Sequence, residues 1–349
     1  MTRTSNGGLE LMRELARGLP EQLADGFEAG RLVGAPSRRG IRAVTVVGMG
    51  GSGIAPHLLA PVLATETELS VSLSDGLTSP FRWDPKTLTV FVSYSGGTWE
   101  TLSAYLEAGR SSAPRIVIAS GGELARRARR DGVPFVALPP GIPPRSAVGF
   151  QLGALLGLVD PWFDRPNAPR IQRVARKIRY RQALWSRPDG LPSRLAERVG
   201  PRMPTIYADS GIGGVARRWK TQVDENAKRL ASYDVLPEVL HNAIVSWDAV
   251  RAPIARRNSV IFLNWAGEDP RVHEASEYLA RLLERRRVAV SSVDIDGADR
   301  LEAIVGGVSI GDHFSLFLAQ NAGVDPLPYD AITRMKETLE RRWAREGPK

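Results

Sequence analysis

Two short turns rich in glycine and hydroxyl residues are the part of this chain best suited to chemistry. The first is Gly48-Met49-Gly50-Gly51-Ser52-Gly53 and the second is Ser93-Tyr94-Ser95-Gly96-Gly97-Thr98. A glycine turn exposes backbone N–H groups, and a helix that starts there adds partial positive charge, so such a turn can bind an anion. The hydroxyl groups of the second turn add short donors. The two turns together predict a cradle for a phosphate monoester, with the binding residues Gly51, Ser52, Ser93, Ser95 and Thr98.

The elements around these turns predict a parallel sheet. Apolar runs precede both turns, at Ala43 to Val47 and at Leu88 to Val92, and a helical pattern follows each. Strands and helices then alternate through residues 42–140, with strands at 43–47, 69–73, 88–92, 115–119 and 134–138 and helices near 54–64, 98–109 and 122–130. This alternation indicates an α/β fold with a doubly wound parallel sheet. Both turns would then lie at the carboxyl edge of the sheet, where ligands bind.

The second half of the chain repeats this order weakly. Pro204 to Asp209 forms an apolar run before the turn Ser210-Gly211-Ile212-Gly213-Gly214, and Ser259 to Asn264 forms another short apolar strand. We therefore expect two α/β domains that face each other across a cleft. The expected division is an N-terminal helical segment, a first domain, a helical linker, a second domain and C-terminal helices, at residues 1–40, 41–158, 159–200, 201–310 and 311–349.

Composition narrows the function classes. The 349 residues include 47 Lys and Arg against 38 Asp and Glu, and the net charge of +9 suits an anionic ligand. The basic residues are dispersed over helical patterns without interleaved aromatics, so we expect no nucleic-acid partner. There is no cysteine, and the four histidines lack ligand spacing, so we expect neither a metal nor another cofactor. Neither a membrane span nor the apolar core of a signal peptide is evident, and a cytoplasmic location is expected.

The first turn also fits two other interpretations. Gly48, Gly50 and Gly53 match the G-x-G-x-x-G fingerprint of dinucleotide-binding proteins, and Asp75 follows at a suitable distance, which would indicate an NAD-dependent oxidoreductase. Tight packing of strand against helix without any ligand would need the same glycines. The hydroxyl cluster of the second turn favours a phosphate monoester, because a dinucleotide needs that part of the groove open.

The sequences of the two turns and of several later segments resemble those of a known protein family. Val47 to Gly53 and Ser93 to Thr101 resemble the sugar isomerase (SIS) domain. Later segments are similar to the bifunctional phosphoglucose/phosphomannose isomerase family, namely Lys220 to Lys228, Leu236 to Asn242 and Ile332 to Lys336. The resemblance spans roughly residues 40 to 340. It implies two SIS domains of the Rossmann-like, flavodoxin type with flanking helices.

The resemblance also implies an activity. Family members interconvert glucose 6-phosphate, and in some cases mannose 6-phosphate, with fructose 6-phosphate through a cis-enediol, without a metal. Such a reaction needs a carboxylate base, a cation for the developing oxyanion and an acid/base pair that opens the sugar ring. An alternative of another class is a regulatory module that binds a sugar phosphate without catalysis.

Four residues would carry this chemistry if the resemblance holds. By spacing alone, Glu225 lies on a polar helix face with Arg229 at i+4, and Lys336 borders the apolar stripe of a helix. His241 would be a loop histidine. Arg145 follows a proline-rich stretch. The resemblance instead makes Glu225 the base that moves the proton between C1 and C2. It makes Arg145 the stabiliser of the enediolate, and His241 and Lys336 partners in ring opening. In the family the histidine comes from the partner subunit, so the resemblance implies a homodimer.

Overall fold

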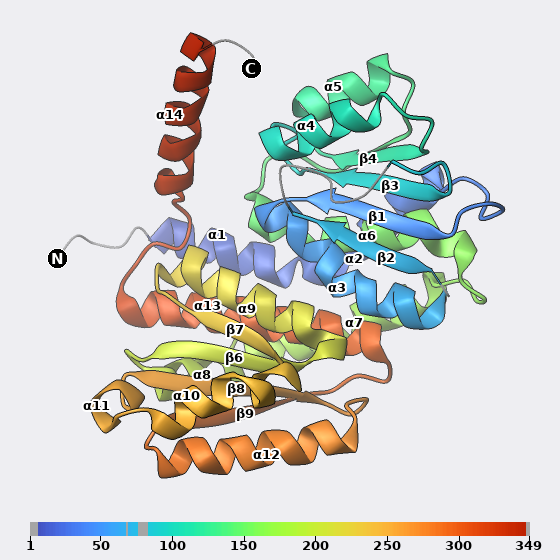
Figure 1. The fold of residues 1–349 in the computed structure, drawn as a ribbon. Coiled ribbons are helices and arrows are strands. Elements are labelled where there is room, and N and C mark those ends of the chain that lie inside the picture. Colours follow the sequence, from blue (N-terminus) through green and yellow to red (C-terminus); the bar gives the residue numbers. More distant parts are fainter. Residues whose placement is uncertain (1–5, 68, 76–82, 347–349) are drawn as a thin grey trace.

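The chain folds into two parallel β-sheets, each covered by helices on both faces (Figure 1). The computed structural model describes residues 6–67, 69–75 and 83–346, so residues 1–5 and 347–349 of the expected terminal segments lie outside the described part. All strand pairs in both sheets are parallel. The expected α/β class with two doubly wound domains is confirmed.

The first sheet holds both of the turns that the sequence singled out. Its strand order is β2-β1-β3-β4-β5, the flavodoxin-type order, and its strands are β1 (Ala43–Gly48), β2 (Ser70–Ser74), β3 (Thr87–Val92), β4 (Arg115–Ala119) and β5 (Phe135–Ala137). In this order β1 and β3 are neighbours, and the chain leaves them in opposite directions along the sheet. The two turns therefore meet at the switch point, because they follow β1 and β3.

Alternating side chains of these strands build two separate cores. On one face Phe91 and Val117 pack against α4 (Trp99–Ala108) and α5 (Gly122–Arg130). On the other face Val90 and Ile116 join the large core formed with three helices, α2 (Leu19–Val33), α3 (Gly50–Glu66) and α6 (Val148–Val159). Because successive strand residues point to opposite faces, nearly continuous apolar runs are what a doubly covered sheet requires.

The second sheet is smaller and has the order β7-β6-β8-β9. Its strands are β6 (Met203–Asp209), β7 (Ser232–Leu236), β8 (Asn258–Trp265) and β9 (Ala289–Ile295). Helices α8 (Leu191–Val199), α9 (Gly213–Ala227) and α13 (Arg300–Ala322) lie on the side toward the first domain, and α12 (Pro270–Arg285) covers the other side together with α10 (Ala243–Ala249) and α11 (Ala252–Ala255) (Figure 1). The sequence predicted β6 and β8; β7 and β9 carry more polar residues and were not predicted.

Helices outside the two sheets join the domains. α1 (Asn6–Arg17) packs on α13, and α7 (Ala168–Trp185) contacts both α2 and α13. The α2–α6 contact depends on glycines: a Cβ on Gly153 would lie 2.2 Å from the Leu23 carbonyl oxygen, and one on Gly30 would lie 2.1 Å from the Ala154 oxygen. These glycines allow the two helix backbones to touch, which fixes α6 and the segment before it.

The C-terminal part differs from the expected division. α13 runs unbroken over 23 residues, so the expected boundary at 310 falls inside one helix. α13 is also long and apolar enough to cross a membrane, but its apolar window is entirely buried in the protein, which makes it a core helix. α14 (Asp330–Glu346) stands away from the body of the molecule in Figure 1.

Candidate active site

Arg145 lies where the two domains meet. It belongs to a short 3-10 helix, Pro144–Ala147, which leads directly into α6, and its residue is only 2% exposed. Gly51, at the start of α3, allows the backbone of this helix to come close: a Cβ on Gly51 would lie 2.9 Å from the Arg145 amide nitrogen. The first glycine turn and Arg145 are therefore direct neighbours.

Glu225 reaches Arg145 from the second domain. It lies near the C-terminus of α9, and its Oε2 is 3.5 Å from Arg145 Nη1. Burial lowers the pKa of Arg145, and the negative charge of Glu225 opposes this shift. The Glu225 side chain is 26% exposed, so its carboxylate is open to a ligand while it faces a buried guanidinium. The pairing of Glu225 with Arg229 that spacing suggested is wrong, because α9 ends at Ala227 and Arg229 donates to the Gly200 and Arg202 carbonyls.

The residues expected to bind phosphate fall into two groups. Ser52 and Ser93 are buried: Ser52 Oγ accepts a hydrogen bond from the Tyr94 amide at 2.8 Å, and Ser93 Oγ donates to Thr98 Oγ1 at 3.0 Å. The first bond ties the two turns to each other, and the second lies within the turn Ser93–Thr98. Ser95 is exposed and Thr98 is half-buried. Thr98 accepts from Ser93, and among the residues that the structure describes its own hydroxyl proton has no acceptor, so it can be donated to a ligand.

The second turn needs glycine at one position above all. Gly96 has φ +65°, and a Cβ there would lie 1.8 Å from the Gly121 carbonyl oxygen. Only glycine fits such a conformation without strain. This close contact fixes the turn between β3 and α4 against the next loop of the sheet, so the hydroxyl groups of the turn have a rigid support.

Two residues beside Glu225 belong to the site and were not predicted. Asn226 is 1% exposed, and its Oδ1 accepts from Arg145 Nε at 3.0 Å. Lys228 ends α9 in the left-handed conformation, and its Nζ donates to the carbonyls of Glu225 and Pro328 at 2.5 and 2.6 Å. Burial lowers the pKa of Lys228, and the nearby positive charge of Arg145 adds to that effect. Asn226 is a polar residue on the buried face of α9, and this burial is evident only from the structure.

The segment between α13 and α14 closes the side of the site. Arg145 Nη2 donates to the carbonyls of Pro326 and Leu327 at 2.7 and 2.9 Å, and the Arg145 guanidinium carbon lies 5.6 Å from the Tyr329 ring centre. Both Arg145 and Lys228 therefore hold this segment by its carbonyl groups. A long-range arrangement of this kind has no local sequence signal.

His241 and Lys336 lie apart from this group in the single chain. His241 is exposed on the 3-10 helix Glu238–His241, after β7. Lys336 is exposed on α14. Within the described part of the chain neither side chain has a hydrogen bond or ion pair to Glu225 or Arg145. Their expected roles stay predictions.

Asp75, the residue that a dinucleotide would need, is engaged by the second domain. Its Oδ2 accepts from Arg217 Nη2 at 2.9 Å and lies 3.9 Å from His57 Nε2. Arg217 comes from α9, so this ion pair fastens the two domains together at the position where a ribose would bind. Among the described residues, no cluster of three or more histidine, aspartate or glutamate side chains is arranged to hold a metal ion.

Comparisons with known proteins find relatives that match most of this chain. Residues 189–339 match the family described as "Bacterial phospho-glucose isomerase C-terminal SIS domain". The bifunctional phosphoglucose/phosphomannose isomerase of Caldicellulosiruptor bescii is 30% identical over 336 residues, which cover 94% of this chain and 98% of that protein. The enzyme of the same name from Aquifex aeolicus is 30% identical over 305 residues, covering 86% and 91% of the two chains.

The fold has known relatives as well. The crystal structure of tagatose-6-phosphate ketose/aldose isomerase from Escherichia coli superimposes with a TM-score of 0.68 at 19% identity, covering 90% of this chain and 93% of that one. This similarity supports the SIS fold of both domains. Because the sequence match to the Caldicellulosiruptor protein extends over almost the whole of both chains, the chain belongs to the bifunctional phosphoglucose/phosphomannose isomerase family.

Proposed function

We propose that the protein is an aldose–ketose isomerase that interconverts glucose 6-phosphate and fructose 6-phosphate through a cis-enediol. The observation that carries the proposal is the contact between Glu225 and the buried Arg145, 3.5 Å apart, beside the glycine turn of the first domain. A base next to a fixed cation is the arrangement that proton transfer at a carbon beside a carbonyl requires. The curated relatives carry the same activity in their names.

Each group then has a task. The phosphate binds at the two turns, with Ser95, Thr98 and the backbone N–H groups as donors and Ser52 and Ser93 as their support. Glu225 removes the proton from C2 of the aldose and returns it to C1, while the hydroxyl proton of O2 passes to O1, so that C1 ends as an alcohol and C2 as a carbonyl. The guanidinium of Arg145 stabilises the oxygen that becomes negative. A carboxylate and a guanidinium suffice for these steps, so the proposal includes activity in the absence of a metal or other cofactor.

The proposal extends to a cytoplasmic homodimer. His241 is exposed on the second domain and contacts neither Glu225 nor Arg145 among the described residues, so we propose that it acts in the site of a second copy, where it helps to open the sugar ring. Lys336 would assist in that step if α14 approaches the site. Mannose 6-phosphate is a second candidate substrate, since the family accepts both sugars by name.

A coupled assay tests the activity. With a chelator present, the purified protein should convert fructose 6-phosphate to glucose 6-phosphate. Glu225→Gln keeps the shape of the side chain and removes the base, so kcat should fall about 10³-fold or more. A matched control is Asp224→Asn on the same helix, which breaks only the exposed ion pair to Lys220 and should leave kcat within about twofold.

The assay also separates the alternatives. A sugar-phosphate-binding regulatory module would be stabilised against heat by the ligand and would show no turnover. Full activity in Glu225→Gln would remove that residue from the role of base, and loss of activity on chelation would contradict a mechanism without metal.

A further inference from the structure

The side chain of Asn226 is held in one orientation by a chain of hydrogen bonds. Its Nδ2 donates to Ser315 Oγ at 2.9 Å, and Ser315 Oγ in turn donates to the Asp312 carbonyl at 2.8 Å. Ser315 and Asp312 are on α13. Asn226 and Ser315 are essentially inaccessible to solvent. Since the amide nitrogen is engaged in this way, the amide oxygen faces Arg145 and accepts from its Nε at 3.0 Å.

The other contacts of Arg145 share one property: their acceptors are uncharged. Nη2 donates to two backbone carbonyls, those of Pro326 and Leu327, and Nε donates to the Asn226 amide. Nη1 is the nitrogen that faces Glu225, at 3.5 Å. The guanidinium is thus fixed through two of its three nitrogens without being neutralised, and the third nitrogen is directed at the site of reaction.

We propose that Asn226 is a positioning residue for catalysis, which acts through Arg145 and whose lack of charge is part of its role. A neutral acceptor holds the guanidinium in place and leaves its positive charge for the oxygen of the enediolate. A carboxylate at the same position would hold it equally well and would draw the charge away from that oxygen. This inference depends on the proposed isomerase function.

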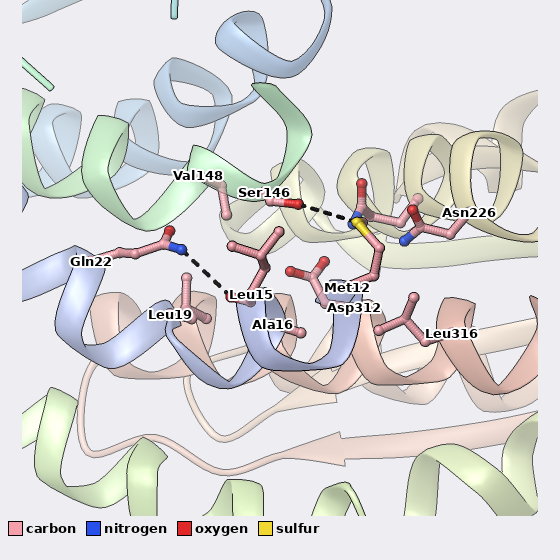
Figure 2. Close-up of a pocket in the computed structure, with 11 residues that line it drawn as sticks. Met12, Leu15, Ala16, Leu19, Gln22, Ser146, Val148, Asn226, Asp312 and Leu316 are labelled. Carbon is pink, nitrogen blue, oxygen red and sulfur yellow. Dashed lines mark hydrogen bonds between the residues drawn. The ribbon is translucent and has the colours of Figure 1, made fainter. Parts of the chain in front are cut away.

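The surroundings of Asn226 exclude direct contact with a sugar. Figure 2 shows Asn226 beside a cavity between α9, α13, the N-terminal helices and the helix of Arg145, with Met12, Ser146 and Asp312 around it. The cavity measures about 10 Å³, which is room for about one water molecule. A hexose phosphate does not fit there, so an effect of Asn226 on catalysis is indirect, and the active-site side chain to which it is hydrogen-bonded is Arg145.

The same cavity provides a matched control. Gln222 lies one turn before Asn226 on α9, lines the cavity and is 2% exposed, but makes no hydrogen bond to Arg145 within the described residues. Gln222→Ala and Asn226→Ala both remove a buried amide from one helix face. A purely structural role would give both variants similar kinetics, whereas positioning of Arg145 would affect only the second.

The experiment compares kcat, KM and the Kd of a five-carbon aldonate phosphate, whose carboxylate resembles the enediolate. In Asn226→Ala, kcat should fall about 100-fold while KM changes less than about threefold, because Arg145 acts mainly in the transition state. The Kd of the aldonate phosphate should rise in parallel with the loss of kcat. Asn226→Asp should lose kcat to a similar extent, and Gln222→Ala should keep kcat within about threefold.

If Asn226→Ala does not fold, Ser315→Ala provides a second test of the role of Asn226. It leaves the amide in place, removes its anchor on α13, and should lower kcat about three- to tenfold. Two outcomes would overturn the inference about Asn226 while the proposed function stands, provided that the wild-type protein turns over. One is an unchanged kcat in both Asn226→Ala and Asn226→Asp. The other is a loss of kcat in Gln222→Ala equal to that in Asn226→Ala. Absence of turnover in the wild-type protein would overturn the proposed function and this inference with it.

Discussion

The glycine turns after β1 and after β6 occupy equivalent places in the two domains, yet their surroundings differ. After β1, Gly51 leaves space that the backbone of Arg145 occupies, and the hydroxyl turn after β3 lies beside it. After β6, the Asp209 carboxylate accepts from the Gly211 amide at 2.8 Å and from Trp265 Nε1 at 3.2 Å. An anion is thus already built into the turn after β6, whereas we propose that the turn after β1 offers its backbone N–H groups to a ligand.

The turn after β6 packs against the first domain and connects the two domains. A Cβ on Gly214 would lie 2.5 Å from the His57 carbonyl oxygen of α3, and Arg300 both stacks on Trp265 and donates to the Pro61 carbonyl of α3. The helix that starts at this turn, α9, carries Glu225 at its other end, beside the first turn. Under the proposed function, the turn after β1 binds the ligand, and its counterpart after β6 positions the helix that carries Glu225. The neighbours of a glycine turn, not the turn itself, decide which role it has.

Of the variants that test the difference between the turns after β1 and after β6, we expect Gly51→Ala to lose the most activity. In Gly51→Ala the new Cβ meets backbone atoms of Pro144 and Arg145 at 3.0 and 2.9 Å, so the Arg145 helix must shift. We expect kcat/KM to fall about 100-fold and the free energy of unfolding to fall by about 1–3 kcal/mol. Steady-state kinetics and urea unfolding measure the two quantities. An active variant with normal stability would show that the close approach is unimportant.

A smaller difference, in KM, is expected between hydroxyl groups in the turn after β3 and in the turn after β6. Thr98→Val should raise KM for fructose 6-phosphate about tenfold, because it removes one of the proposed hydroxyl donors to the phosphate and retains the shape of the side chain. Ser210→Ala removes a hydroxyl from the turn of the second domain and should leave KM unchanged. If the two variants have equal KM values, phosphate binding is not confined to the first domain.

The smallest effect concerns stability alone. Asp209→Ala removes the carboxylate that accepts from the Gly211 amide and from Trp265. We expect the free energy of unfolding to fall by about 1–2 kcal/mol, as for the loss of other helix caps, with KM unchanged. Chemical denaturation beside an activity assay is sufficient to test this. An increase in KM would indicate that this turn also takes part in binding the substrate.

The sequence was most informative where local patterns determine structure. Both glycine turns of the first domain and all five strands of its sheet were predicted. The signal was strongest for β1, β3 and β4, because doubly covered strands are nearly continuous apolar runs. β9 was missed because only one of its faces is well buried, and its sequence Ala-Val-Ser-Ser-Val-Asp-Ile has adjacent serines and an aspartate that weaken the strand signal. β7, a short strand at the sheet edge, has a similarly weak signal.

The site itself could be predicted only in part. The residue types were recognised from family motifs, but the contact between Arg145 and Glu225 joins positions 80 residues apart, and local spacing suggested Arg229 instead. The buried roles of Ser52 and Ser93 likewise depend on tertiary neighbours. Asn226 stands out only once α9 is known to bury that face against α13, since a polar residue on a buried stripe must have a partner.

A crystal structure with fructose 6-phosphate or the five-carbon aldonate phosphate bound would test the central claim most directly. We expect the phosphate at the first turn, within hydrogen-bond distance of Ser95 and Thr98, and the C1–C2 bond about 3–3.5 Å from the carboxylate of Glu225. A phosphate bound at the turn after β6, or a sugar whose C1 and C2 lie beyond contact of Glu225, would contradict the account.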